Sequence, residues 1–243
     1  MGIETFVPGL LKNPYRRLRS ALKNGRPGQS NSQIFNSIYQ ASVWGTSEGG
    51  AAYSGSGSYD PSVATYVEFV RDFIRENQIR SIVEIGCGDF SIGRQYADYV
   101  QRYLGVDVAS FVITQNRAKF GREGLVFEHV DASKQDLPRS DLCIIRQVLQ
   151  HLDNGTIGEI LARTATHRFL LITEHLPAPS RLNKPNLNKR TGPDTRVVFG
   201  SGVYVDLPPF GRKGIAVLRL PVAQPQAGPG EEMRTTLLVN SGD

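Results

Sequence analysis

Three acidic residues stand at the ends of three successive apolar stretches of the sequence. Glu84 lies two residues before Gly86 in IVEIGCGDF, Asp107 lies in YLGVDV, and Asp131 directly follows LVFEHV. Because parallel strands end at one edge of a sheet, carboxylates at three strand ends would lie close together. The first suits a cationic or amine-bearing ligand, the second suits the two hydroxyls of a ribose, and the third suits an adenine amino group. This pattern predicts a binding site at that edge.

A glycine pair follows the first of these stretches. Gly86 and Gly88 lie between a strand and the next element, where glycine lets backbone amides approach a ligand closely. A dinucleotide site would have a third glycine at position 91, where this chain has Ser91. The glycine pair therefore indicates a ligand-binding turn, and the missing third glycine argues against an NAD site.

Candidate reactive groups follow the fourth and fifth apolar stretches. His151 lies in the loop after the fourth, where an imidazole with a pKa near neutrality suits general-base work. Glu174 and His175 end the fifth and would face the same edge, where either could orient a base or bind a substrate hydroxyl. Each of the three also has a structural alternative, which for His151 is a hydrogen bond to the backbone at the start of a helix.

Alternating strands and helices must position these residues. Strands are predicted at 81–86, 103–108, 125–130, 141–146, 169–174, 214–221 and 233–240. Helices are predicted at 33–41, 61–77, 90–102, 110–120 and 157–166, the last with a Thr156–Glu159 capping box. The alternation predicts an α/β fold with a mostly parallel sheet and helices on both faces. The two closing strands, joined by a turn rich in proline and glycine, are expected to pair antiparallel at one edge.

Four motifs carry a resemblance to a known family. VEIGCGD at 83–89, GVDV at 105–108, VDAS at 130–133 and DLCIIRQVLQHL at 141–152 resemble motifs of class I S-adenosylmethionine-dependent methyltransferases in type, order and spacing. The resemblance covers residues 60–175. It implies S-adenosylmethionine as the cofactor and a Rossmann-like, seven-stranded sheet with antiparallel last strands. IYQASVWG, SGSGS, DTR and LPPF, at 38–45, 54–58, 194–196 and 207–210, are similar to a bacterial subgroup of small-molecule or saccharide methyltransferases.

The resemblance implies a role for each matched residue. Glu84 and the amides near Gly86 and Gly88 would hold the methionine amine and carboxylate, Asp107 the ribose, and Val108 and Asp131 the adenine. The implied cofactor-binding residues are Glu84, Gly86, Cys87, Gly88, Asp107, Val108, Asp131, Ala132, Arg146 and Gln147, the last two on the methyl side. The expected acceptor-binding residues are Tyr39, Trp44, His175 and Arg196, and the expected catalytic residues are His151 and Glu174.

Charge and composition set the domain boundaries. The chain has 243 residues and a net charge of +5, all of it carried by residues 1–30, which form a predicted basic, helical N-terminal extension. Residues 12–26 could lie on an anionic membrane face, or this helix could pack on the domain. Residues 31–60 are a helix and a Gly/Ser-rich loop, which is either a linker or a cover over the cofactor. By the resemblance, residues 61–243 would form the methyltransferase domain, with a lid loop at 175–212.

The lid loop has a local excess of basic residues, which suggests an acceptor with an acidic or phosphate group, although a solvated loop would look the same. Arg196 is the favoured anion-binding residue there because a guanidinium binds carboxylate or phosphate in a bidentate way.

The near-neutral charge of residues 31–243 argues against nucleic acid as a partner. Two cysteines without metal-type spacing argue against a disulfide scaffold and a zinc–cysteine site. No metal is expected, because Arg146 and Gln147 take part of the space at the ends of the fourth and fifth stretches and Glu174 is the one carboxylate there. The N-terminal stretch lacks the apolar core of a secretory signal, so a cytoplasmic location is expected.

The sequence thus predicts an enzyme that methylates oxygen on a small molecule or a saccharide, with His151 as the base. An alternative is N-methylation of a small amine, with Glu174 holding the amine. A third hypothesis is a catalytically silent subunit that binds the cofactor and serves a partner protein. The sequence does not indicate the oligomeric state.

Overall fold

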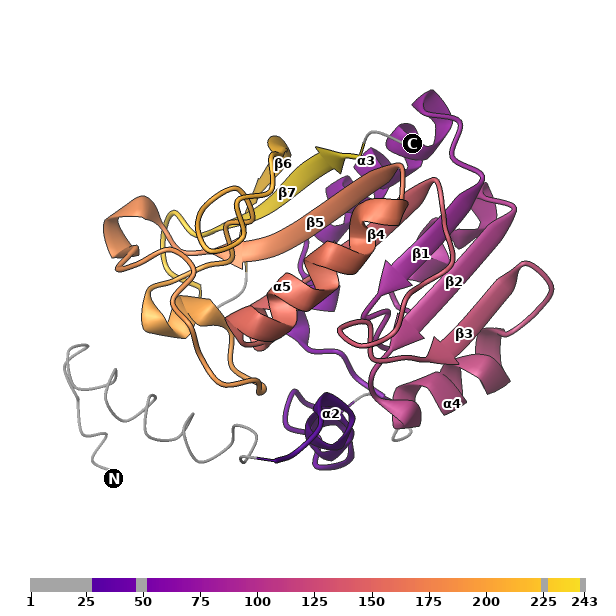
Figure 1. Cartoon of the computed structure of the whole chain (residues 1–243), viewed down its shortest axis with the longest axis horizontal. Coiled ribbons are helices and arrows are strands. Elements are labelled where there is room, and N and C mark those ends of the chain that lie inside the picture. The colour runs from indigo at the N-terminus through magenta and orange to yellow at the C-terminus, as the bar shows by residue number, and fades with distance from the viewer. Residues whose placement is uncertain (1–27, 47–51, 224–226, 241–243) are drawn as a thin grey trace, which may run out of the picture.

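A mixed sheet forms the centre of the computed structural model, which describes residues 28–46, 52–223 and 227–240 (Figure 1). The sheet has seven strands in the order β3-β2-β1-β4-β5-β7-β6. The strands are β1 Ser81–Ile85, β2 Arg102–Asp107, β3 Leu125–His129, β4 Leu142–Arg146, β5 Phe169–Leu176, β6 Ile215–Pro221 and β7 Glu232–Val239. β1 to β5 pair in parallel, and β7 runs antiparallel to both of its neighbours, β5 and β6. The predicted fold class is confirmed.

The register of the central strands brings the predicted acidic residues to one edge. Ile85 at the end of β1 pairs with Val106 of β2 and with Ile145 of β4. β1 is buried along its whole length, and the apolar residues of β4 are fully buried, as expected for strands covered on both faces. The residues that follow these strands therefore start from the same level of the sheet.

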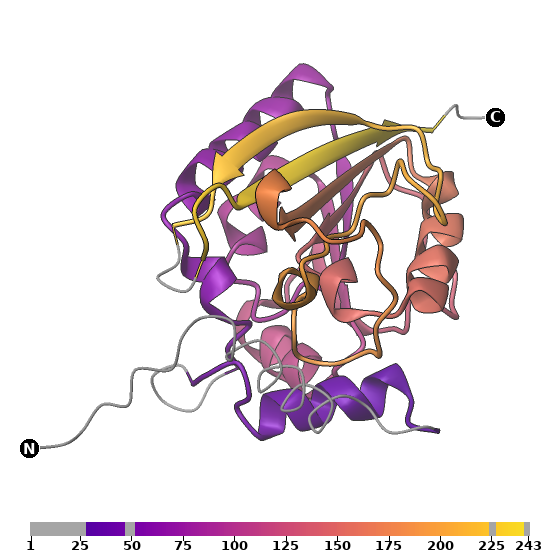
Figure 2. The same cartoon turned by 90° about the vertical axis from the view of Figure 1, so that its left-hand side faces the viewer.

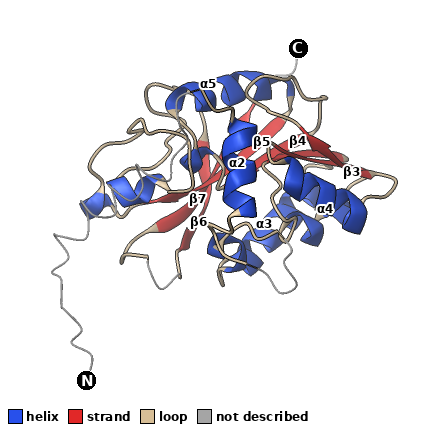
Figure 3. Ribbon diagram, turned by 90° about the horizontal axis from the view of Figure 1, so that it is seen from below, coloured by secondary structure: helices blue, strands red, loops and turns tan. Residues whose placement is uncertain are grey.

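Helices cover both faces of the sheet, as predicted. They are α3 Val63–Glu76, α4 Ser110–Phe120 and α5 Asn154–Arg163. Figure 3 shows α5 on one side of the strands and α3 and α4 on the other. In α3 the buried residues Tyr66, Val70 and Phe73 recur at helical spacing and pack on the sheet.

Two predicted helix features were wrong in detail. α5 begins at Asn154, and its N-cap is Asp153, whose side chain accepts the N–H of Thr156, so the expected capping box at Thr156 is absent. The helix expected at 90–102 is two short 3₁₀ turns, Gly93–Gln95 and Ala97–Tyr99. Phe90 adopts a left-handed φ of +61° that places its ring in the core, and this conformation prevents a regular helix from starting there.

A cover of residues 31–46 and 52–60 lies across the carboxyl ends of the strands. It consists of α2, Asn31–Gln40, and a segment that contains a 3₁₀ turn, Ser56–Tyr59. Figure 2 shows α2 at the bottom of the molecule and β6 and β7 at the top, and the view from below places α2 in front of the strand ends (Figure 3). The side chain of Asn36 accepts the N–H of Phe111 at 3.0 Å, which anchors α2 on α4. The described part of the Gly/Ser-rich segment is therefore a cover and not a linker.

The lid loop is more ordered than its sequence suggested. β5 continues to Leu176, and the loop contains the 3₁₀ turns Pro179–Arg181 and Arg196–Phe199. The amide group of Asn186 donates to the carbonyls of Tyr204 and Pro208, and its oxygen accepts the N–H of Tyr204.

The predicted basic extension lies almost entirely in residues 1–27, outside the described residues. None of the helices in the described ranges has the length and apolar character needed to cross a membrane.

Candidate functional site

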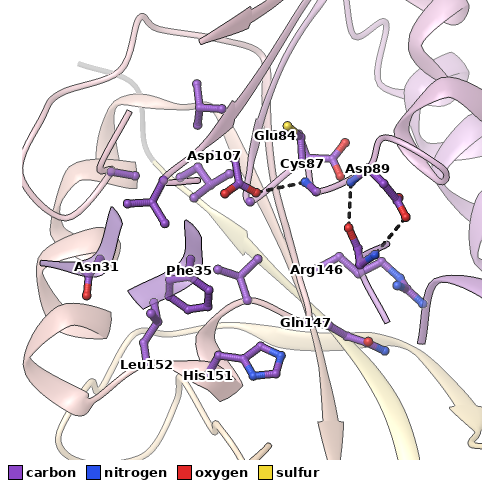
Figure 4. Close-up of a pocket in the computed structure, with 18 of the residues that line it drawn as sticks. Asn31, Phe35, Glu84, Cys87, Asp89, Asp107, Arg146, Gln147, His151 and Leu152 are labelled. Carbon is purple, nitrogen blue, oxygen red and sulfur yellow. Dashed lines mark hydrogen bonds between the residues drawn. The ribbon is translucent and has the colours of Figure 1, made fainter. Parts of the chain in front are cut away.

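A cavity opens at the carboxyl ends of β1, β2 and β4, beneath the cover (Figure 4). The structure brings most of the predicted site residues into its wall. These are Tyr39, Trp44, Glu84, Gly86, Cys87, Gly88, Asp107, Val108, Asp131, Ala132, Arg146, Gln147 and His151. The predicted residues Glu174, His175 and Arg196 do not line it.

Asp107 lies in the middle of the cavity wall, between Asn31 and Glu84 (Figure 4). Its two carboxylate oxygens accept the backbone N–H groups of Gly88 at 3.1 Å and Ala109 at 2.8 Å. Burial raises the pKa of Asp107 to about 6, and the backbone hydrogen bonds oppose that rise. These bonds orient a carboxylate toward the cavity, where a ligand with paired hydroxyls could complete its hydrogen bonding.

One end of the cavity is closed by the start of α2. The side chain of Asn31 donates to Asp131 at 3.4 Å, and Phe35 contributes an apolar wall. Asp131 also accepts the N–H and hydroxyl of Ser133 at 3.1 and 2.6 Å. With Val108 alongside, this end offers apolar surface and an acceptor, which suit a heteroaromatic ring with an amino group.

The other end of the cavity contains two opposite charges. Glu84 accepts hydrogen bonds from the hydroxyls of Tyr96, at 3.0 Å, and Tyr103. Burial raises the pKa of Glu84 to about 7. Arg146 donates from Nη2 to the carbonyl of Gly57 at 3.1 Å and lies over the ring of Tyr66, and burial lowers its pKa.

The predicted glycine pair is explained by close packing within the protein. Gly86 and Gly88 have φ values of +73° and +53°. A Cβ at Gly86 would meet Val148 at 2.3 Å, and one at Gly88 would meet the hydroxyl of Ser54 at 2.3 Å. The space that the missing side chains leave is filled by Val148 and by Ser54 of the cover.

The backbone amides of this turn are all used within the protein. The N–H groups from Gly86 to Phe90 donate, in order, to Val106 O, Val106 O, Asp107 Oδ2, Ser54 Oγ and Cys87 O. The expectation that amides near Gly86 and Gly88 hold a ligand carboxylate therefore stays a prediction, which would require these amides to exchange or share their present acceptors.

His151 contributes a neutral imidazole to the wall. Its ring lies 5.2 Å from that of Trp44, and Tyr39 packs edge-on against Trp44 at 5.3 Å. Burial, with a smaller effect of the Lys189 charge, lowers the pKa of His151 to about 3, so the expected value near neutrality was wrong. Its Nδ1 is buried and has no hydrogen-bond partner among the described residues, its Nε2 lies 3.5 Å from Nε2 of Gln150, and the backbone of residues 192–194 partly opposes the fall in its pKa.

Glu174 and Arg196 lie behind the cavity wall and hold the turn that carries His151. Glu174 accepts the N–H groups of Leu149 at 2.9 Å and Gln150 at 3.1 Å, and burial raises its pKa to about 8. Arg196 is fully buried and donates to the carbonyls of Leu152, at 2.6 Å, and Leu187. This placement contradicts the expectation that Arg196 binds the acceptor, because a buried guanidinium satisfied by carbonyls presents no surface to it.

His175 also lies outside the cavity. Its Nε2 is 2.9 Å from a carboxylate oxygen of Glu231, which also pairs with Arg181 at 2.8 Å. This cluster ties the end of β5 to the start of β7. Among the described residues, no group of three or more histidine, cysteine or acidic side chains is placed to hold a metal ion.

Several wall residues were missed by the sequence analysis, namely Asn31, Phe35, Ser54, Ser58, Asp89, Leu152, Thr156 and Ile160. The SGSGS motif pointed to the segment of Ser54 but not to that residue, and Asp89 ends the first motif. Asn31 and Phe35 belong to a predicted helix whose sequence carries no signal for the cavity.

Comparison with known proteins agrees with this architecture. Residues 83–163 match the family described as a methyltransferase domain. The fold is similar to that of the N-methyltransferase NodS from Bradyrhizobium japonicum, solved with S-adenosyl-L-homocysteine, with a TM-score of 0.54 and 12% identity over 75% of this chain and 89% of that one. No curated protein matches the chain.

Two further solved structures share the fold. Magnesium protoporphyrin IX methyltransferase from Synechocystis, with bound S-adenosylmethionine, has a TM-score of 0.55 and 13% identity over 89% of this chain and 100% of that one. Human N-acetylserotonin methyltransferase, also with S-adenosylmethionine, has a TM-score of 0.52 and 15% identity over 95% of this chain and 67% of that one.

Proposed function

Since the chain is a class I S-adenosylmethionine-dependent methyltransferase, we propose that it methylates a hydroxyl oxygen of a small molecule or a saccharide. The observation that carries this proposal is the neutral imidazole of His151 in the cavity wall, with a buried Nδ1 that has no hydrogen-bond partner in the described part of the chain. A neutral imidazole accepts a hydrogen bond from a hydroxyl, whereas an imidazolium would not.

The cavity residues fit the donor from end to end. Phe35, Val108, Asp131 and Ala132 would enclose the adenine, and Asp107 would accept hydrogen bonds from the ribose hydroxyls. Glu84 would hold the ammonium of the methionine part. This order follows the wall from Asn31 through Asp107 to Glu84 (Figure 4). The reacting methyl group would then lie near Arg146, Gln147 and His151.

S-adenosylmethionine, when bound, supplies an electrophilic methyl group on a positively charged sulfur. The protein contributes proximity and alignment, because the transfer is an in-line displacement. As the C–O bond forms and the C–S bond breaks, His151 would accept the hydroxyl proton and pass it on to water. Because burial lowers the pKa of His151 to about 3, its imidazole is a weak base and would accept a proton most readily from an acidic hydroxyl. Acidic hydroxyls, such as those of phenols, would therefore be the best acceptors.

The N-methylation hypothesis loses the residue on which it depended, because Glu174 bonds to Leu149 and Gln150 and does not line the cavity. Tyr39 and Trp44 remain candidates for acceptor contacts. An aromatic wall of this kind suits the flat face of a phenol or the apolar face of a sugar ring.

Matched pairs of acceptors test the proposal. The protein would be incubated with methyl-labelled donor and either a phenol or the corresponding aniline, and either a sugar or the corresponding amino sugar. We expect label on oxygen, and we expect His151→Gln to lower turnover by about a hundredfold while donor affinity is kept. Label on nitrogen alone, or full activity of His151→Gln, would contradict the proposal.

A further inference from the structure

The charged end of the cavity holds an acid and a base that do not neutralise each other. Glu84 and Arg146 both line the cavity, and each influences the pKa of the other through its charge. Even so, they form no ion pair in the structure, and each is held by uncharged groups, Glu84 by two tyrosines and Arg146 by a carbonyl and a ring. Burying two opposite charges that do not pair costs desolvation free energy, which a ligand that pairs with each of them would offset.

Each of the two side chains has unused hydrogen-bonding atoms. Both tyrosine hydroxyls donate to Oε2 of Glu84, so Oε1 has no partner among the described residues. Arg146 uses only Nη2, toward Gly57; its Nε has no partner, and Nη1 makes no hydrogen bond to the described residues. The cavity end therefore offers one carboxylate oxygen and guanidinium N–H donors.

The backbone N–H groups of the neighbouring turn already donate to acceptors within the protein. These are all the N–H groups from Gly86 to Phe90, as described above. A carboxylate at this end would find free donors elsewhere, and Arg146 is the cationic residue in the cavity wall. In Figure 4 the side chains of Glu84 and Arg146 lie on the same side of Asp107, away from Asn31 and Phe35.

We propose that Glu84 and Arg146 form a clamp for the zwitterionic amino-acid end of the donor, with the ammonium on Glu84 and the carboxylate on Arg146. The inference rests on the donor arrangement under Proposed function and adds Arg146 as a specificity-determining residue. A guanidinium suits this role because its planar N–H groups match a carboxylate. The clamp would select donors with an intact amino acid over nucleosides that lack the carboxylate.

Three ligands separate the contributions in titration calorimetry. S-adenosylhomocysteine carries both charged groups, its decarboxylated analogue keeps only the amine, and 5′-methylthioadenosine has neither. We expect Arg146→Met to weaken S-adenosylhomocysteine binding by at least about tenfold and to leave the decarboxylated analogue within about threefold. Arg146→Lys should fall between the two, because it keeps the charge but loses the planar donors.

Arg71 provides a matched control. It lies over the ring of Tyr99 at 5.1 Å and donates to the carbonyl of Gln95, as Arg146 does with Tyr66 and Gly57, but it does not line the cavity. Arg71→Met should bind all three ligands as the wild type does.

Two results would overturn the clamp. One is unchanged S-adenosylhomocysteine affinity in Arg146→Met, which would mean that Arg146 does not bind the donor carboxylate and is free to bind an acidic group of the acceptor. The other is an equal loss for all three ligands, which would reduce Arg146 to a support for the cover at Gly57. Failure of the wild type to bind S-adenosylhomocysteine would instead contradict the donor arrangement itself, so the two failures are distinguishable.

Discussion

Ser54 and Asp89, 35 positions apart in the sequence, hydrogen-bond each other twice. The N–H of Ser54 donates to Asp89 Oδ2 at 3.0 Å, and the N–H of Asp89 donates to Ser54 Oγ at 2.7 Å. The hydroxyl of Tyr39 in α2 lies 3.1 Å from the same Ser54 oxygen. This pair fastens the cover to the glycine turn at the charged end of the cavity.

Ser54→Ala should therefore weaken donor binding without unfolding the protein. The substitution removes the acceptor for the Asp89 amide and the partner of Tyr39, and we expect S-adenosylhomocysteine affinity to fall by about tenfold. Ser37→Ala is the control, because Ser37 bonds only to its own helix, on the exposed face of α2. Equal affinities of the two variants in calorimetry would show that the cover does not contribute to donor binding.

Asp107→Ala should abolish measurable donor binding while the fold survives. The substitution removes a charged acceptor from the ribose, and we expect a loss of about a hundredfold or more in affinity. It also leaves the amides of Gly88 and Ala109 without their acceptor, so a modest loss of thermal stability should accompany it. Glu128→Ala, at an exposed carboxylate of β3, should change neither quantity. Unchanged affinity of Asp107→Ala would exclude the ribose assignment.

Donor binding should release protons near neutral pH. Burial raises the pKa of Glu84 to about 7 in the free protein, so this carboxyl is partly protonated there. A bound ammonium favours the ionised form, and affinity should therefore rise with pH up to about 7, by up to about tenfold per unit, and then level off. Calorimetry in buffers of different ionisation enthalpy measures the release.

Glu84→Gln should remove this dependence between pH 6 and 7 and bind the donor more weakly at pH 8. A weaker dependence below pH 6 should remain, because the pKa of Asp107 is raised to about 6. An unaltered pH profile in Glu84→Gln would mean that another group controls binding.

Arg196→Met should reduce stability more than it changes any binding constant. It leaves the carbonyls of Leu152 and Leu187 without their donor inside the protein, at a cost of about 3 kcal/mol in the free energy of unfolding. Urea denaturation measures this cost. Arg190→Met, at an exposed lid position, is the control and should be neutral. A stable Arg196→Met protein whose acceptor KM alone is raised would restore the role inferred from the sequence.

The sequence was most informative where function depends on the ends of strands. Glu84 and Asp107 lie near or at the ends of their strands and Asp131 follows its strand, so their meeting at one edge follows from the alternation of strands and helices. Arg146, the last residue of β4, and Gln147, which follows it, were instead implied by the family resemblance.

Side-chain direction and burial from distant segments could not be predicted in this way. Glu174 and Arg196 carry the types and positions of site residues, but they turn away to satisfy backbone groups of the loops at 149–152 and 187. The pKa of His151 falls because Trp44 and the lid exclude water, and neither is near it in the sequence. The apolar spacing at 90–102 predicted a helix, but the left-handed backbone conformation of Phe90 cannot be inferred from the spacing of apolar residues.

The cover has a kinetic consequence. Asn31 fastens it at one end of the cavity and Ser54 at the other, so a nucleoside bound between them would be held beneath the cover by contacts at both ends. If ligand exchange breaks these contacts, each catalytic cycle would require the cover to open and close once, and the demethylated product, which shares the nucleoside and amino-acid parts of the donor, would be retained. Turnover would be limited by product release, and the enzyme would be sensitive to the ratio of methylated to demethylated nucleoside around it.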